Sequence, residues 1–190
     1  ESRCVMEGKA FLVRFTTDWT CGLLWNKLYK RALFDGIFFE EGHKIDDEYF
    51  TYQGVMNAAK VVCDPRVVYN YRQRASSVMQ SPAAKAQIAV DRIDFMAKRR
   101  EKVLERFPEL RREFDISFVD ALSYLADYPD NTEESIRLLK YYARRYFLQR
   151  GNTFPPRYLL KAVFLMYVTG TEKLLKRPQA KKPSPEDYYA

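Results

Sequence analysis

The sequence has few of the residues that build metal sites, disulfide frameworks and flexible turns. Its 190 residues include three cysteines, one histidine and seven glycines. Cys4, Cys21 and Cys63 are odd in number, widely spaced and without a CxxC pair. This pattern excludes a disulfide scaffold and favours free thiols in a reducing compartment. We therefore expect a cytoplasmic location.

Long apolar runs and a signal sequence are also lacking. The longest apolar run is shorter than the roughly 20 residues of a membrane-spanning helix, and no charged region followed by an apolar stretch opens the chain. We expect a soluble protein, or one that is peripheral at the inner face of the membrane. Because the first residue is Glu1 rather than methionine, we also expect a piece of a longer protein.

The charge of the chain is unbalanced. Its 32 lysines and arginines exceed its 25 aspartates and glutamates, which gives a net charge of +7. Such a surface favours anionic partners, namely phosphates, nucleic acid or an anionic membrane. With 47% hydrophobic residues, the chain can bury a core, and disorder throughout the chain is excluded.

Hydrophobic periodicity predicts a helix-rich chain. Apolar residues recur at three- and four-residue intervals in six segments, and Ser81 followed by Pro82 is typical of a helix start. The predicted helices are 9–34, 48–60, 82–107, 113–128, 132–149 and 156–176. Val and Tyr at alternate positions predict short strands at 60–63 and 66–72, with Asp64 and Pro65 as a turn between them.

Three acids, Asp46, Asp47 and Glu48, stand directly before an aromatic-rich helical segment. One interpretation is an Asp cap with further acids in the first turn, where a cap stabilises by about 1 kcal/mol. The other is that one carboxylate, held at a helix start, acts as a general base in group transfer. The residues alone leave both interpretations open.

Four pieces in a fixed order carry a resemblance to a known family. They are WNKLYKR from residue 25, a phenylalanine followed by EG, an acid pair before an aromatic helix, and YNYRQRASS from residue 69. Over roughly residues 9–80 the chain thus resembles the C-terminal part of bacterial family 2 glycosyltransferases. This family includes makers of capsule and surface polysaccharide. The resemblance implies an α-rich α/β fold, the second half of a GT-A type nucleotide-diphospho-sugar transferase fold.

The resemblance also implies roles for individual residues. In the family the second acid of the pair is the base that deprotonates the acceptor hydroxyl during inverting transfer, which corresponds to Asp47. Asp46 occupies the position where the family usually has glutamate, and it is expected to act as a supporting acid. Arg72 and Arg74 are expected to hold the donor diphosphate or an acidic acceptor, although a solvated strand end remains an alternative. The implied partners are a nucleotide-sugar donor and a glycan or lipid-linked acceptor.

The family's donor-binding half is not recognisable in this sequence, which has no Asp-x-Asp motif. A divalent metal, Mn²⁺ or Mg²⁺, is therefore expected only in the full-length enzyme, and this chain alone should be inactive. His43 is a weak candidate for a metal ligand, because a lone histidine in a polar loop usually faces solvent.

Other residues of the first part have two interpretations each. Trp25 either stacks on a sugar or belongs to the core, and Asn26 and Lys27 are expected near the site. The predicted organisation is an acceptor-side part over 1–80, a helical bundle extension over 81–177 and a flexible tail over 178–190.

A basic helical interaction or nucleic-acid-binding module is the alternative function, because arginine-rich segments recur in the second half. Acids alternate with these bases, so we expect no nucleic-acid partner. The stretch YLLKAVFLMYV, residues 158–168, is expected either as a core helix or as an interfacial helix that makes peripheral membrane contact. Homo-oligomer formation also stays open.

Overall fold

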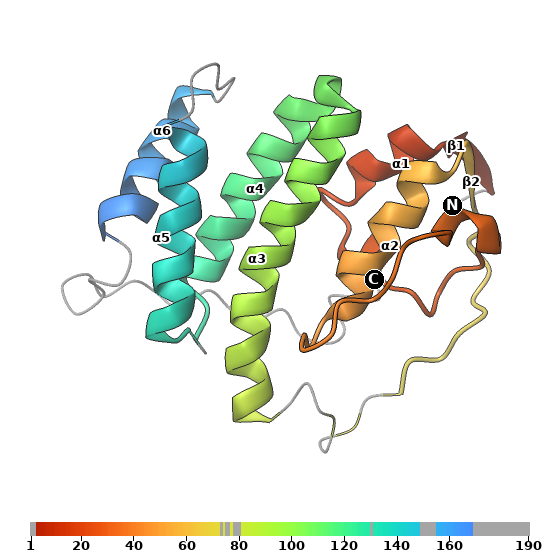
Figure 1. The fold of residues 1–190 in the computed structure, drawn as a ribbon, viewed down its shortest axis with the longest axis horizontal. Coiled ribbons are helices and arrows are strands. Elements are labelled where there is room, and N and C mark those ends of the chain that lie inside the picture. Colours follow the sequence, from red (N-terminus) through yellow and green to blue (C-terminus); the bar gives the residue numbers. More distant parts are fainter. Residues whose placement is uncertain are drawn as a thin grey trace.

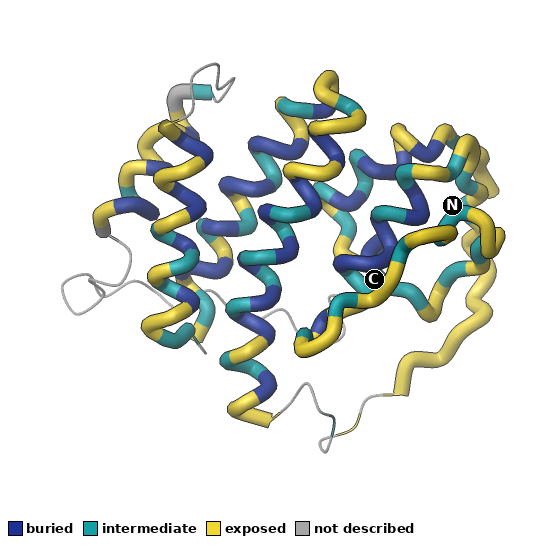
Figure 2. Tube along the Cα trace, in the orientation of Figure 1, coloured by how far each residue is buried: buried dark blue, intermediate teal, exposed yellow. Residues whose placement is uncertain are grey.

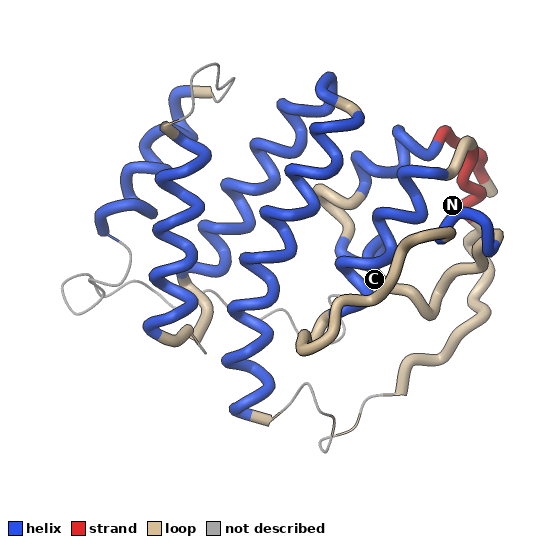
Figure 3. The backbone as a smooth tube through the Cα atoms, in the orientation of Figure 1, coloured by secondary structure: helices blue, strands red, loops and turns tan. Residues whose placement is uncertain are grey.

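The structure is a computed structural model that describes residues 3–72, 74, 77, 81–129, 131–148 and 155–168. It is helix-rich with one small sheet, which confirms the α-rich character expected from the sequence. The sheet has two antiparallel strands, β1 (Cys4–Glu7) and β2 (Lys60–Cys63), with Cys4 opposite Cys63 and Glu7 opposite Lys60. Figure 3 shows this pair as the short red segments at one edge of a helical molecule.

The central element is α3 (Pro82–Arg106), the longest helix. In Figure 1, α1 (Gly8–Arg14), α2 (Asp46–Asn57) and the sheet lie on one side of it. The helices α4 (Arg111–Ala126), α5 (Glu133–Phe147) and α6 (Pro156–Val163) lie on the other side. A π-helical turn, η5 (Phe164–Val168), extends α6. Short 3-10 turns complete the description: η1 (Trp19–Gly22), η2 (Arg31–Phe34) and η4 (Pro108–Leu110).

Two hydrophobic cores share α3. One combines Ile93 and Ala97 with residues of α4, α5 and α6, and the other combines Ile88 and Phe95 with residues of α1 and α2. Met96 packs against both cores. Figure 2 accordingly shows buried residues along most of α3. The second core joins residues on both sides of position 80, so the segment before residue 80 and the helices that follow it pack together.

Most predicted helices after residue 45 are confirmed. Ser81 caps α3 by accepting a hydrogen bond from the Ala84 amide, with Pro82 in the first turn, as expected. Thr132 caps α5 in a reciprocal capping box with Ser135. The predicted tail, 178–190, and residues 169–176 of the last predicted helix lie outside the described residues.

The prediction of one helix over 9–34 was wrong, because α1 ends at Arg14. The hydroxyl of Thr16 donates to the Val13 carbonyl at 2.6 Å, and Asp18 accepts from the Thr20 amide at 2.9 Å. Such short polar side chains compete with the helical hydrogen bonds and redirect the chain. The apolar residues that follow are used in turns rather than in a continuous helical face.

The predicted strand at 60–63 is confirmed as β2, whereas 66–72 does not pair in a sheet with any described residue. This segment is extended and exposed, with Val67 and Val68 largely open to solvent. Val and Tyr favour a strand but cannot form one without a neighbouring edge that supplies hydrogen bonds. None of the described helices is long and apolar enough to span a lipid bilayer.

Candidate functional site

The three acids occupy the first turn of α2. Ile45 is the N-cap residue and makes no side-chain cap bond, so the expectation of an Asp cap was wrong. Asp46 is exposed, whereas Asp47 is half-buried and accepts a hydrogen bond from the Glu48 amide at 3.0 Å. The acids still lie where the positive end of the helix dipole favours negative charge.

Asp47 lies against the WNKLYKR segment. Burial raises the pKa of its carboxyl; the Glu48 and Leu24 amides oppose this rise by hydrogen bonding, and the charge of Asp46 adds to it. Asp47 also acts electrostatically on Lys27. A carboxylate with a raised pKa holds a proton more strongly than an exposed one and is therefore the stronger base. The chemistry available at this point is proton acceptance.

Lys27 and Asn26 build the loop that faces Asp47. The Lys27 ammonium donates to the Thr20 carbonyl at 2.8 Å, the Leu23 carbonyl at 2.6 Å and the Asn26 side chain at 2.6 Å. Burial lowers the pKa of Lys27 to about 8. With three acceptors around three ammonium hydrogens, Lys27 holds the loop in shape beside Asp47.

Trp25 does not belong to either hydrophobic core. Its indole stacks on Tyr69 at 4.4 Å and on Tyr71 at 5.0 Å between ring centroids, and the residue is 37% exposed. These contacts bring the YNYRQR segment to the WNKLYKR segment. The two tyrosines are exposed as well, so this aromatic cluster lies at the surface.

Arg72 and Arg74 lie in the exposed extended segment next to this cluster in sequence. Neither forms an ion pair with a described residue. One shallow hollow of the described surface lies on α5, and another lies between α2 and the C-terminal half of α3. Asp47, Arg72 and Arg74 do not line these two hollows.

The phenylalanine and EG piece also packs against α2. Phe39 stacks on Phe50 at 3.9 Å, and Phe34 stacks on Phe50 at 4.4 Å. Gly42 has a φ of 88°, a left-handed conformation that glycine adopts without steric cost. The chain between η2 and α2 is therefore fastened to the helix that carries Asp47.

Gly54 makes this aromatic packing possible, and its replacement is expected to disrupt the site. A Cβ atom at Gly54 would lie 2.2 Å from the Phe34 ring. We expect Gly54→Ala to destabilise the protein by about 1–3 kcal/mol through overpacking, measured by urea unfolding. Gly36→Ala is a weaker comparison because its cost arises from a positive φ, with no atom within 4 Å of the added Cβ. Equal stability of Gly54→Ala and the parent protein would contradict the tight packing.

His43 connects the loop to α3. Its Nδ1 lies 3.1 Å from Asp91 Oδ1 and its Nε2 lies 3.3 Å from Glu40. Asp91 is buried and also accepts from the Lys44 amide at 2.7 Å. Among the residues that the structure describes, no group of three or more His, Cys, Asp and Glu side chains is arranged to hold a metal ion.

Sequence reasoning missed Arg99, a buried cation of α3. Its guanidinium lies over the rings of Phe15 and Phe95, and its Nε has no hydrogen-bond partner among the residues that the structure describes. Burial lowers the pKa of Arg99, and Glu48 opposes that effect. The third acid of the cluster thus offsets a buried positive charge. A charged residue within an arginine- and lysine-rich helix gives no sequence signal for this role.

Comparison of the chain with protein-family models, curated proteins and solved structures gives no match.

Proposed function

We propose that this chain is the acceptor-side part of an inverting glycosyltransferase of the GT-A type, with Asp47 as its general base. One observation carries the proposal: the four sequence pieces that resemble family 2 glycosyltransferases lie together around the start of α2. Asp47 lies against WNKLYKR, Trp25 stacks on the tyrosines of YNYRQR, and Phe39 packs on α2. These contacts link the pieces to one another and to the helix that carries Asp47, which supports a common role for them.

In the proposed reaction Asp47 accepts the proton of an acceptor hydroxyl. The hydroxyl oxygen forms a bond to the anomeric carbon of the donor sugar as the bond from that carbon to the nucleoside diphosphate breaks. The proton ends on Asp47 and the electron pair leaves with the diphosphate. Arg72 and Arg74 are the residues of this chain suited to bind phosphate oxygens or an acidic acceptor.

Trp25 is proposed to receive a sugar ring of the acceptor, because aromatic faces pack against the apolar face of a sugar. Its stacking on two tyrosines fixes the ring orientation. The divalent metal of the family would help to neutralise the leaving diphosphate, and its ligands would come from the donor-binding half. None of the steps assigned to this chain depends on it.

The experiment is a transfer assay on the natural full-length chain with a panel of UDP and GDP sugars and Mn²⁺ or Mg²⁺. We expect release of nucleoside diphosphate from at least one donor that increases when a glycan or glycolipid acceptor is added. No acceptor-dependent release from any donor, by a folded protein that binds nucleotide sugars, would refute the transferase proposal.

A further inference from the structure

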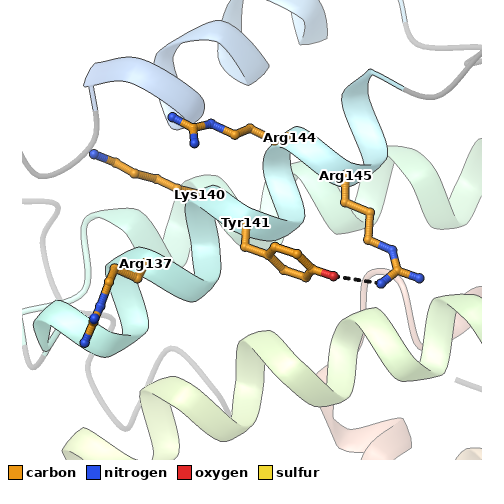
Figure 4. Close-up of a pocket in the computed structure, with 5 residues that line it drawn as sticks. All are labelled: Arg137, Lys140, Tyr141, Arg144 and Arg145. Atoms are coloured by element: carbon orange, nitrogen blue, oxygen red, sulfur yellow. Dashed lines mark hydrogen bonds between the residues drawn. The ribbon is translucent and has the colours of Figure 1, made fainter.

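One face of α5 carries a row of cations. Arg137, Lys140, Tyr141, Arg144 and Arg145, here called the basic face, line a shallow hollow on this helix (Figure 4). Arg145 pairs with Glu101 at 3.1 Å and donates to the Tyr141 hydroxyl at 2.9 Å. Arg137, Lys140 and Arg144 form no ion pair with any residue that the structure describes. Their charges are available to an external anion.

The neighbouring helix exposes apolar side chains. Tyr158, Ala162, Leu165 and Met166 of α6 and η5 are buried in the core. The same segment also exposes a second set, here called the apolar stripe, which is Leu159, Leu160, Val163 and Tyr167. Leu160 is 76% exposed and Tyr167 is 63% exposed. Core packing accounts for the first set only.

The basic face and the apolar stripe form one continuous surface. The Arg144 guanidinium lies 5.8 Å from the centre of the Tyr167 ring. Figure 1 shows α5 and α6 side by side, and the two elements are in contact. In Figure 4, Arg144 and Lys140 extend from α5 toward the side where α6 and η5 lie. Unpaired cations therefore border exposed apolar side chains.

We propose that this surface binds the face of an anionic lipid bilayer, with the apolar stripe inserted among the lipids and the basic face against their phosphate and carboxylate groups. Burial of apolar side chains at the interface and attraction of nearby cations act together in peripheral binding. A second copy of the chain would bring the same unpaired cations against one another. A nucleic acid would satisfy the cations and leave Leu160 in water, so a bilayer fits both features best.

The test is co-sedimentation of the full chain with vesicles. We expect binding to vesicles of phosphatidylcholine with about one third phosphatidylserine and little binding to phosphatidylcholine alone. The double variant Lys140→Ala/Arg144→Ala is expected to bind the anionic vesicles about 25-fold more weakly, at about fivefold for each cation. Leu160→Glu is expected to weaken binding at least about tenfold, because it removes an inserted apolar side chain.

Arg112→Ala and Val5→Glu are matched controls, because both positions are exposed and lie outside this surface and outside the proposed acceptor site. Their binding should equal that of the parent chain, and circular dichroism checks that every variant is folded. Equal binding to neutral and anionic vesicles, or unchanged binding of folded Leu160→Glu, would overturn the proposal. Tighter binding to duplex DNA than to anionic vesicles, weakened in Lys140→Ala/Arg144→Ala but not in Leu160→Glu, would assign the basic face to nucleic acid instead.

Discussion

Asp47→Asn is expected to lower the rate of sugar transfer about 10²- to 10⁴-fold in the full-length enzyme. Asparagine keeps a side-chain oxygen that can accept the hydrogen bond now donated by the Glu48 amide, but it cannot take a proton from the acceptor. The assay is acceptor-dependent release of nucleoside diphosphate under saturating donor. Donor binding should be unchanged, because Asp47 acts on the acceptor.

The stability of the Asp47→Asn variant distinguishes a general-base role of Asp47 from a structural role. The folded-state pKa of Asp47 is raised, so the folded protein favours the protonated form, and that contribution is lost as pH rises through the folded pKa. Above that folded-state pKa the charged carboxylate costs stability, and Asp47→Asn should there be as stable as the parent or slightly more stable. Asp46→Asn, at the exposed neighbour, is the control and should retain most of the activity. A stable Asp47→Asn enzyme with unchanged transfer would remove the base assignment.

Asp115→Ala is expected to destabilise the protein by about 3–5 kcal/mol. The Arg100 and Asp115 side chains are 5% and 1% exposed, and Arg100 Nε donates to Asp115 Oδ1 at 2.7 Å while Nη2 donates to the same oxygen. Removing the carboxylate leaves an arginine buried in the core between α3 and α4 without its counter-charge. Urea unfolding followed by circular dichroism gives the difference.

Two matched variants test the cause of this loss. Glu109→Ala breaks the exposed pair with Lys9, whose side chains are 43% and 53% exposed, and should cost less than about 1 kcal/mol. Replacing both buried partners, Arg100→Met with Asp115→Leu, should recover most of the stability lost in Asp115→Ala. A loss in Asp115→Ala no larger than that in Glu109→Ala would show that the pair is not isolated from solvent.

The helices that follow the acid cluster could be predicted because their signals are local. Ser81 with Pro82, and Thr132, act within one turn of the helices that they start. The first part of the chain could not be predicted in the same way. Some of its apolar residues between 15 and 34 pack against distant elements, as Phe34 does against Phe50, whereas others, such as Leu28, are exposed. The pairing of β1 with β2 is likewise a long-range contact that no local pattern specifies.

The location of Asp47 at a helix start could be inferred from the order of acids and aromatics, but its environment could not. The amide of Leu24 and the ring stacking of Trp25 on Tyr71 join segments that are far apart in sequence. Arg99 and Arg100 are adjacent in a basic stretch that is typical of a solvated helix, yet both are buried. They face the two different cores because α3 is covered on both sides.

The pH dependence of sugar transfer tests the role of Asp47 most directly. Because the base must be ionised, the rate should fall as pH is lowered through the folded-state pKa of Asp47, which burial raises from its ordinary value. We predict that a single ionisation lowers the transfer rate of the parent enzyme at acid pH. The residual transfer rate of Asp47→Asn should not show this ionisation. If the transfer rate of Asp47→Asn fell at the same pH and with the same steepness as that of the parent enzyme, the role of Asp47 as the base would be contradicted.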